Sequence, residues 1–161
     1  MEDDWFRAFV HESGHAIMGA KQMIRCYGVF LIQQPLKACV LADPLPPPSE
    51  LSNELRLYLA AGSEAELIIF KNADPAGSAQ DRKFFGNPSI TTFEEKRDEA
   101  EALLFDKKSL IEGLGSRLHE IYKQSGGDFS HLRVQRAGMG DNFTDYWVLL
   151  SEEELKSELL V

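Results

Sequence analysis

The sequence predicts an α+β fold that is predominantly helical, with a small β-sheet or hairpin beside the first helix. Apolar residues recur at three- and four-residue steps in residues 3–24, 49–71 and 92–125, which is the period of a buried helix face. Residues 26–42 instead contain two short β-branched and aromatic runs with a turn between them, which is typical of a hairpin. The chain of 161 residues has an ordinary apolar content of 43%, sufficient for one domain with its own core.

The first helix carries the strongest chemical signal in the chain, the pattern H-E-x-x-H formed by His11, Glu12 and His15. Residues four apart lie on one face of an α-helix, so both imidazoles can bind one Zn²⁺ ion and leave room for a third protein ligand and a water. Glu12 is placed to take a proton from that water. The alternative is an amphipathic helix with two partly buried, hydrogen-bonded histidines. Gly14 weakens the helix by about 1 kcal/mol relative to alanine, which close approach of another backbone would explain.

The predicted hairpin at residues 26–42 bears on function because of its position in the chain. A strand edge beside a zinc-binding helix would let an extended peptide add on through backbone hydrogen bonds. The alternative is an ordinary small sheet that covers the helix. The prolines of residues 45–48 then form a stiff, extended linker within the domain.

The second helix is predicted at residues 49–71, with Ser49 as its N-cap. Its run of small residues at 60–63 suits close packing against another helix. Glu64 and Glu66 follow within an apolar segment, and a buried carboxylate needs a partner. That partner is a metal ion, a ligand histidine or a basic side chain such as Arg82.

The rest of the chain is predicted to be helical and then less regular. In residues 72–91, a loop with a short helix, S-A-Q-D has the form of a capping box, which places Asp81 in a helix's first turn. Residues 92–125 form one long helix or two, with a break near 106–109. The expected C-terminal elements are a basic, glycine-rich loop at 134–140, a strand at 145–150 and a short helix capped by Ser151.

Composition excludes several classes of partner. The net charge of -9 argues against binding nucleic acid or anionic lipid, because no basic surface displaces phosphate counterions. No apolar run approaches the length of a membrane span, and the acidic N-terminus is unlike a secretory signal. We therefore expect a cytoplasmic protein in which Cys26 and Cys39 are free thiols.

Three motifs occur in order along the chain: H-E-S-G-H-A from residue 11, L-A-A-G-S-E-A-E-L-I-I-F from residue 59 and G-S-A-Q-D from residue 77. In this order they resemble the peptidase domain of FtsH-type AAA zinc metalloproteases, with its H-E-A-G-H-A, G-G-R-x-A-E-E-x-x-F and T-G-A-x-N-D segments. The resemblance is collinear over roughly residues 5–125. It implies a single zincin-like metallopeptidase domain over residues 1–161, in which 126–161 is a C-terminal extension without a counterpart.

The resemblance also assigns site residues. His11 and His15 match the zinc ligands, Glu12 matches the general base, and Asp81 matches the third ligand. Without the resemblance, the sequence does not distinguish Asp81 from Glu64 or Glu66 as the third ligand. Glu66 matches the first glutamate of the A-E-E segment, and we infer for it a role in orienting a ligand histidine. The chain departs from the family pattern at Ser13, Ala61, Ser63 and Leu67.

The family's ATPase module and membrane segment have no counterpart in this sequence. The resemblance therefore implies a zinc metalloendopeptidase that hydrolyses unfolded or flexible polypeptides without ATP. One alternative is a catalytically inactive relative that binds zinc structurally and serves as a peptide- or protein-binding module. Another is a helical interaction protein with an accidental H-E-x-x-H and no metal. The sequence is compatible with a homo-oligomer but determines neither oligomeric state nor substrate.

Overall fold

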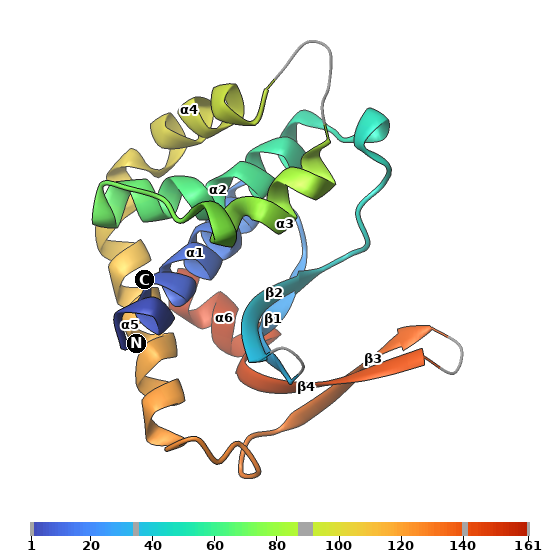
Figure 1. Cartoon of the computed structure of the whole chain (residues 1–161), viewed down its shortest axis with the longest axis vertical. Coiled ribbons are helices and arrows are strands. Elements are labelled where there is room, and N and C mark those ends of the chain that lie inside the picture. The colour runs from blue at the N-terminus through green and yellow to red at the C-terminus, as the bar shows by residue number, and fades with distance from the viewer. Residues whose placement is uncertain (1, 34–35, 87–91, 140–141, 161) are drawn as a thin grey trace.

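The computed structural model describes residues 2–33, 36–86, 92–139 and 142–160, and it confirms an α+β fold that is mostly helical (Figure 1). Its helices are α1 (Glu2–Lys21), α2 (Asn53–Phe70), α3 (Pro75–Phe85), α4 (Phe93–Leu104), α5 (Lys108–Gln124) and α6 (Glu152–Leu159). Its strands are β1 (Cys26–Gln33), β2 (Leu36–Ala42), β3 (Val134–Met139) and β4 (Asn142–Ser151). Single 3₁₀ turns occupy Pro48–Glu50 and Phe105–Lys107. No helix in the described ranges is long and apolar enough to cross a membrane.

Helix α1 packs directly on α2, and glycines allow the close approach. A Cβ added at Gly14 would lie 2.5 Å from the carbonyl oxygen of Ala61 and 2.6 Å from the Cβ of Ala65. Such distances are shorter than any ordinary van der Waals contact, so no other residue fits at this position. The close approach suggested by Gly14 and by the small residues of α2 is therefore confirmed.

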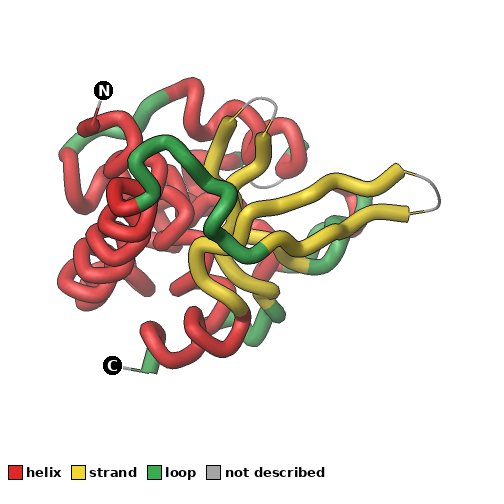
Figure 2. The backbone as a smooth tube through the Cα atoms, turned by 90° about the horizontal axis from the view of Figure 1, so that it is seen from below, coloured by secondary structure: helices red, strands yellow, loops and turns green. Residues whose placement is uncertain are grey.

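The strands form one antiparallel sheet in the order β2-β1-β4-β3. The predicted hairpin is confirmed, since β1 pairs with β2 in a register that joins Val29 to Val40. The sheet packs against α1, α5 and α6 through a shared apolar core that includes Phe9, Leu31, Leu118 and Leu155. Strand β2 lies at one edge of this sheet, and helix α1 packs beside it. In both views, β3 and the adjoining part of β4 project away from the body (Figures 1 and 2).

Two predicted caps are wrong. Helix α2 begins after Ser52, whose side chain accepts a hydrogen bond from the backbone N–H of Leu55, whereas Ser49 lies in a 3₁₀ turn. Helix α3 begins at Pro75 with Asp74 as its N-cap, four residues before the predicted capping box. Asp81 therefore lies in the middle of α3, where the dipole at the helix start does not explain it.

The predicted loop at residues 134–140 is also wrong over its described part, because Val134–Met139 form strand β3. Each residue of β3 pairs with β4, from Val134 opposite Trp147 to Met139 opposite Asn142. Glycine and basic residues have low strand propensity, and pairing with the neighbouring strand overrides it. The predicted strand at 145–150, the break between α4 and α5, and the Ser151 capping box are confirmed. Part of the predicted turn after β1 lies at residues 34–35, outside the described ranges.

Glycine positions give a direct test of the helix packing. Gly14→Ala is expected to lower the free energy of unfolding by about 1–3 kcal/mol, because the added methyl group overlaps the backbone of α2. Gly113→Ala on α5 is the matched control, since nothing lies within 4 Å of its added Cβ. That change should stabilise the protein by about 0.5–1 kcal/mol through helix propensity. Urea denaturation measures both, and equal effects of the two substitutions would contradict the packing argument.

Glu64 is a buried carboxyl group on α2 with an exposed fraction of 4%. Among the described residues no side chain hydrogen-bonds to it, and the suggested partner Arg82 instead pairs with Glu94. Burial, together with the nearby Glu101, raises the pKa of Glu64 to about 7. The folded protein therefore binds a proton here more tightly than the unfolded chain does, and the free energy of unfolding falls as pH rises from about 4.5 to 7.

Glu64→Gln removes this titration. We expect it to raise the free energy of unfolding at pH 8 by about 1–2 kcal/mol, after allowance for solvent screening, and to change it little at pH 4. Denaturation at the two pH values measures the difference. Glu112→Gln, which alters an exposed residue of α5, should have no effect at either pH. A stabilisation equal at pH 4 and pH 8 would show that the charge of Glu64 is not the cause.

Candidate metal centre

Three ligand atoms from two helices converge at one point. His11 Nε2 and His15 Nε2, both on α1, are 3.1 Å apart. Asp81 Oδ2, on α3, lies 2.9 Å from the first and 3.1 Å from the second. In a tetrahedral zinc site with bonds of 2.0–2.1 Å, ligand atoms are about 3.3 Å apart. The observed triangle is close to that size.

The other ring nitrogen of each histidine is anchored, and this fixes the tautomer. His11 Nδ1 lies 2.7 Å from Glu66 Oε2, and His15 Nδ1 lies 2.7 Å from the carbonyl oxygen of Tyr58. Burial acts to raise the pKa of Glu66, but hydrogen bonds from His11 and Arg7 lower it overall, so Glu66 is ionised. Both partners are therefore acceptors, and both Nδ1 atoms must carry hydrogen. A neutral ring then has only a lone pair at Nε2.

Three acceptors that face one another repel unless a cation lies between them. Without a metal, that cation is a proton. Burial acts to lower the pKa of His11, but hydrogen bonds with Asp81 and Glu66 outweigh it and raise this pKa to about 10. The same negative surroundings suit a divalent ion, which would replace the proton and satisfy all three lone pairs.

Gly62 leaves the space that an ion needs. It lies on α2, directly beside the two histidines, and a Cβ added there would lie 2.5 Å from His11 Nε2 and 2.6 Å from His15 Nε2. Any side chain at this position would fill the cradle between the ligand atoms. The donor set and the open cradle both fit a bound zinc ion.

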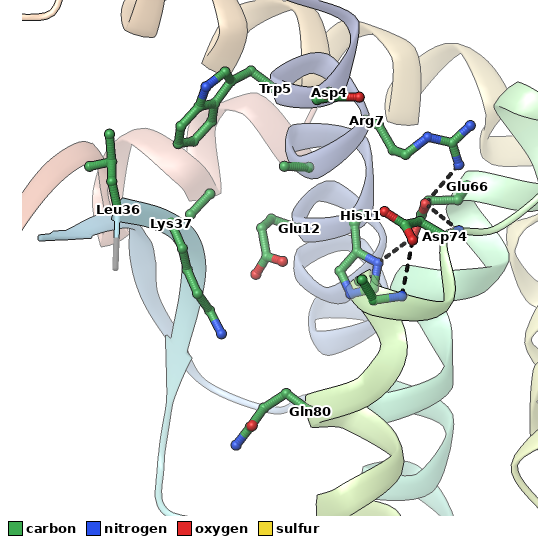
Figure 3. A pocket seen from close by; sticks show the side chains of 14 residues that line it. Asp4, Trp5, Arg7, His11, Glu12, Leu36, Lys37, Glu66, Asp74 and Gln80 are labelled. Atoms are coloured by element: carbon green, nitrogen blue, oxygen red, sulfur yellow. Dashed lines mark hydrogen bonds and ion pairs between the residues drawn. The ribbon is translucent and has the colours of Figure 1, made fainter. Parts of the chain in front are cut away.

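Glu12 lies between the candidate metal centre and the sheet. His11, Glu12 and His15 offer ligand atoms that lie within 4.8 Å of one another. Glu12 Oε1 also accepts a hydrogen bond of 2.9 Å from the backbone N–H of Val40 in β2. Burial raises the pKa of Glu12 above its ordinary value, which increases its ability to hold a proton. Its carboxylate points into the cavity beside His11 (Figure 3).

Two cavities meet at Glu12 and His11. One of about 290 Å³ has Trp5 and Leu36 among its walls, and the other, of about 710 Å³, runs between β2 and α3. Both are lined by Lys37 of β2 and Gln80 of α3. Together they form a groove along the outer edge of β2. Because backbone groups alternate in direction along a strand, those of Ala38 and Ala42 face the groove as Val40 does.

The structure brings together all five residues proposed from the sequence, namely His11, Glu12, His15, Glu66 and Asp81. Glu66 contacts His11, the proposed ligand that it was inferred to orient. Sequence reasoning missed Gly62, the N–H of Val40 and the salt bridge of 2.8 Å between Arg7 and Glu66. Arg7 precedes His11 by four residues, so their common helix face was the available signal.

No protein-family model, no curated protein and no solved structure matches this chain. Support for a metal centre therefore comes from the geometry of the chain's own residues.

Metal content tests the site directly. Protein purified without chelators is expected to contain one zinc ion per chain, because the two histidines and Asp81 supply three ligands. Asp81→Ala should weaken zinc binding by more than about 100-fold, since loss of a ligand exceeds loss of a group that only orients one. Asp106→Ala, at an exposed carboxylate, is the control and should bind zinc normally. Metal analysis and competition with a chromogenic chelator measure both, and an Asp81→Ala protein with undiminished zinc would remove Asp81 from the ligand set.

Zinc affinity should also increase with pH. Zinc must displace the proton shared at the two Nε2 atoms, and His11 holds that proton with a pKa of about 10. Between pH 6 and 9 we therefore expect about a tenfold gain in affinity per pH unit for each proton released. Calorimetry in buffers of different ionisation enthalpy counts these protons. In the Asp81→Ala protein, zinc affinity should depend less steeply on pH near neutral pH. A wild-type zinc affinity that does not change with pH would contradict a proton held at this site in the apoprotein.

Proposed function

We propose that this protein is a zinc-dependent metallopeptidase that hydrolyses peptide bonds in unfolded or flexible polypeptides without ATP. One observation carries the proposal: two imidazole nitrogens and one carboxylate oxygen converge beside a glutamate, in a groove bounded by a strand edge. The motif order that resembles FtsH-type peptidase domains supports it, as does the packing of the H-E-x-x-H helix beside the edge strand β2.

The ligand chemistry favours zinc among the common divalent ions. Imidazole suits zinc, whereas calcium and magnesium prefer sites made wholly of oxygen atoms. Three protein ligands leave a fourth position open, which is the pattern of catalytic rather than structural zinc sites. The open cradle above Gly62 and the adjoining groove are consistent with that reading.

The residues divide the reaction between them. His11, His15 and Asp81 would hold the metal, which would supply Lewis-acid polarisation of a scissile carbonyl and of the attacking water. Glu12 accepts the proton of the attacking water and passes it to the leaving amine. The outward backbone groups of Ala38 and Ala42 hold an extended substrate chain along β2. A folded protein does not present such an extended segment, so flexible chains are the expected substrates.

Glu12→Gln tests the mechanism. The amide keeps the shape and the acceptor oxygen that faces Val40 but cannot take a proton. We expect the rate of cleavage of an unfolded, fluorescently labelled protein to fall by about 10²–10⁴-fold, with zinc affinity nearly unchanged. Glu112→Gln is the matched surface control. Cleavage by the Glu12→Gln protein at the wild-type rate would overturn the proposed mechanism.

A second candidate function is a zinc-stabilised peptide-binding module. The hydrogen bond from Val40 to Glu12 favours it, because one oxygen of the proposed base is engaged by backbone at 2.9 Å. This alternative predicts bound zinc and capture of extended peptides on the edge of β2, with no turnover on any unfolded protein or peptide library. Detectable zinc-dependent cleavage that is lost in Glu12→Gln would exclude it.

A further inference from the structure

Arg7 connects the start of α1 to the segment between α2 and α3. It lies four residues before His11, on the same face of the helix. Its Nη1 atom donates to Glu66 Oε1 at 2.8 Å and to the carbonyl oxygen of Asn72 at 3.2 Å. Its Nη2 atom donates to Asn72 Oδ1 at 2.8 Å, and the guanidinium group stacks on the Phe70 ring with its central carbon 4.4 Å from the ring centroid. The guanidinium group is thus bonded to Glu66 and to Asn72, and Figure 3 shows the first of these bonds.

The two oxygens of Glu66 have different donors. Oε2 accepts from His11 Nδ1 at 2.7 Å, whereas Oε1 accepts from Arg7 and from the backbone N–H of Asp74 at 3.1 Å. The Glu66 side chain is only 1% exposed, so water does not replace a missing donor. Loss of Arg7 would leave the backbone N–H of Asp74 as the one donor to Oε1 among the described residues, and the carboxylate would be held less firmly against His11.

Arg7 also fixes the segment that leads to the third ligand. Asn72 accepts two hydrogen bonds from Arg7. Two residues further along the chain is Asp74, the N-cap of α3. Asp81 is carried by α3 less than two turns further on. The guanidinium group of Arg7 therefore restrains His11 on α1 through Glu66. It also restrains the start of α3, the helix that carries Asp81.

We propose that Arg7 is a positioning residue of the metal centre, which raises zinc affinity by orienting His11 through Glu66 and by anchoring the start of α3 through Asn72. This inference rests on the proposed zinc site but not on peptidase activity. The competing explanation is a purely structural ion pair, which stabilises the apoprotein and leaves zinc affinity unchanged.

The experiment measures the zinc dissociation constant by chelator competition for variants of the full chain. Arg7→Ala should weaken binding by about 10–100-fold, the range for groups that orient a metal ligand. Arg7→Lys should recover part of this loss, because an ammonium group reaches Glu66 but has no planar fork for Asn72. Asn72→Ala, which leaves Glu66 untouched, should cost less than Arg7→Ala. Arg25→Ala removes an exposed arginine paired with Glu152 and should leave the dissociation constant unchanged.

A double-mutant cycle with Glu66→Gln separates positioning from general stability. If Arg7 acts through Glu66, Arg7→Ala should cost much less zinc affinity in the Glu66→Gln protein than in the wild type. Equal fold-losses in the two backgrounds would overturn the route through Glu66. Should Arg7→Ala fail to fold by circular dichroism, Arg7→Lys takes its place in the cycle.

The remaining outcomes distinguish this inference from the proposed function. Wild-type protein that binds no zinc would overturn both. Zinc bound by wild type and Arg7→Ala with the same affinity would overturn the inference about Arg7 alone. Zinc that depends on Arg7 in a protein without peptidase activity would support the inference and overturn the peptidase.

Discussion

The close packing of α1 on α2 is the constraint on which the rest of the site depends. Gly14 lets the backbone of α2 approach the H-E-x-x-H helix, and Gly62 keeps space open beside the two Nε2 atoms. The same contact brings the carbonyl oxygen of Tyr58 and the carboxylate of Glu66 to the two Nδ1 atoms. A wider separation of the two helices would break both hydrogen bonds, and the imidazole rings would no longer have a fixed orientation.

The electrostatics of this packed region suit a cation. Glu12, Glu66 and Asp81 surround two buried histidines, and Glu66 is itself buried. Burial acts to raise the pKa of Asp81, but the two histidines outweigh it and hold that pKa well below its ordinary range. Buried charges of this kind are stable only when paired. Arg7 compensates Glu66, whereas the charge of Asp81 is left to a proton or a metal ion shared with the imidazoles.

The sheet provides none of the proposed metal ligands, but it positions Glu12 and one wall of the groove. Its edge strand β2 borders the groove, and the N–H of Val40 ties the strand to Glu12. Because β4 returns beside β1, residues from the end of the chain complete the sheet that supports this edge. The C-terminal segment, which matches nothing in the motif pattern of the first 125 residues, is therefore structurally joined to the strand that lines the groove.

Local patterns were sufficient to predict the elements that depend on neighbouring residues. Helical periodicity predicted α1 and α2, the apolar runs at 26–42 predicted the hairpin, and the Ser151 capping box was found from four residues. Predictions failed where another residue could serve as the cap, or where strand pairing outweighed local propensity. Ser52 rather than Ser49 caps α2, and β3 gains its structure from pairing with β4 although its own residues favour a loop.

The sequence by itself determined that His11 and His15 share one helix face with Glu12 next to the first of them, because spacing along a helix fixes that geometry. Only the tertiary structure decided which carboxylate completes the site. Glu64, Glu66 and Asp81 are chemically alike, and the packing of α2 and α3 on α1 gives each a different partner: no hydrogen-bonding side chain among the described residues for Glu64, the Nδ1 atom of His11 for Glu66, and both Nε2 atoms for Asp81. Those contacts join residues more than fifty positions apart, and no local pattern records them.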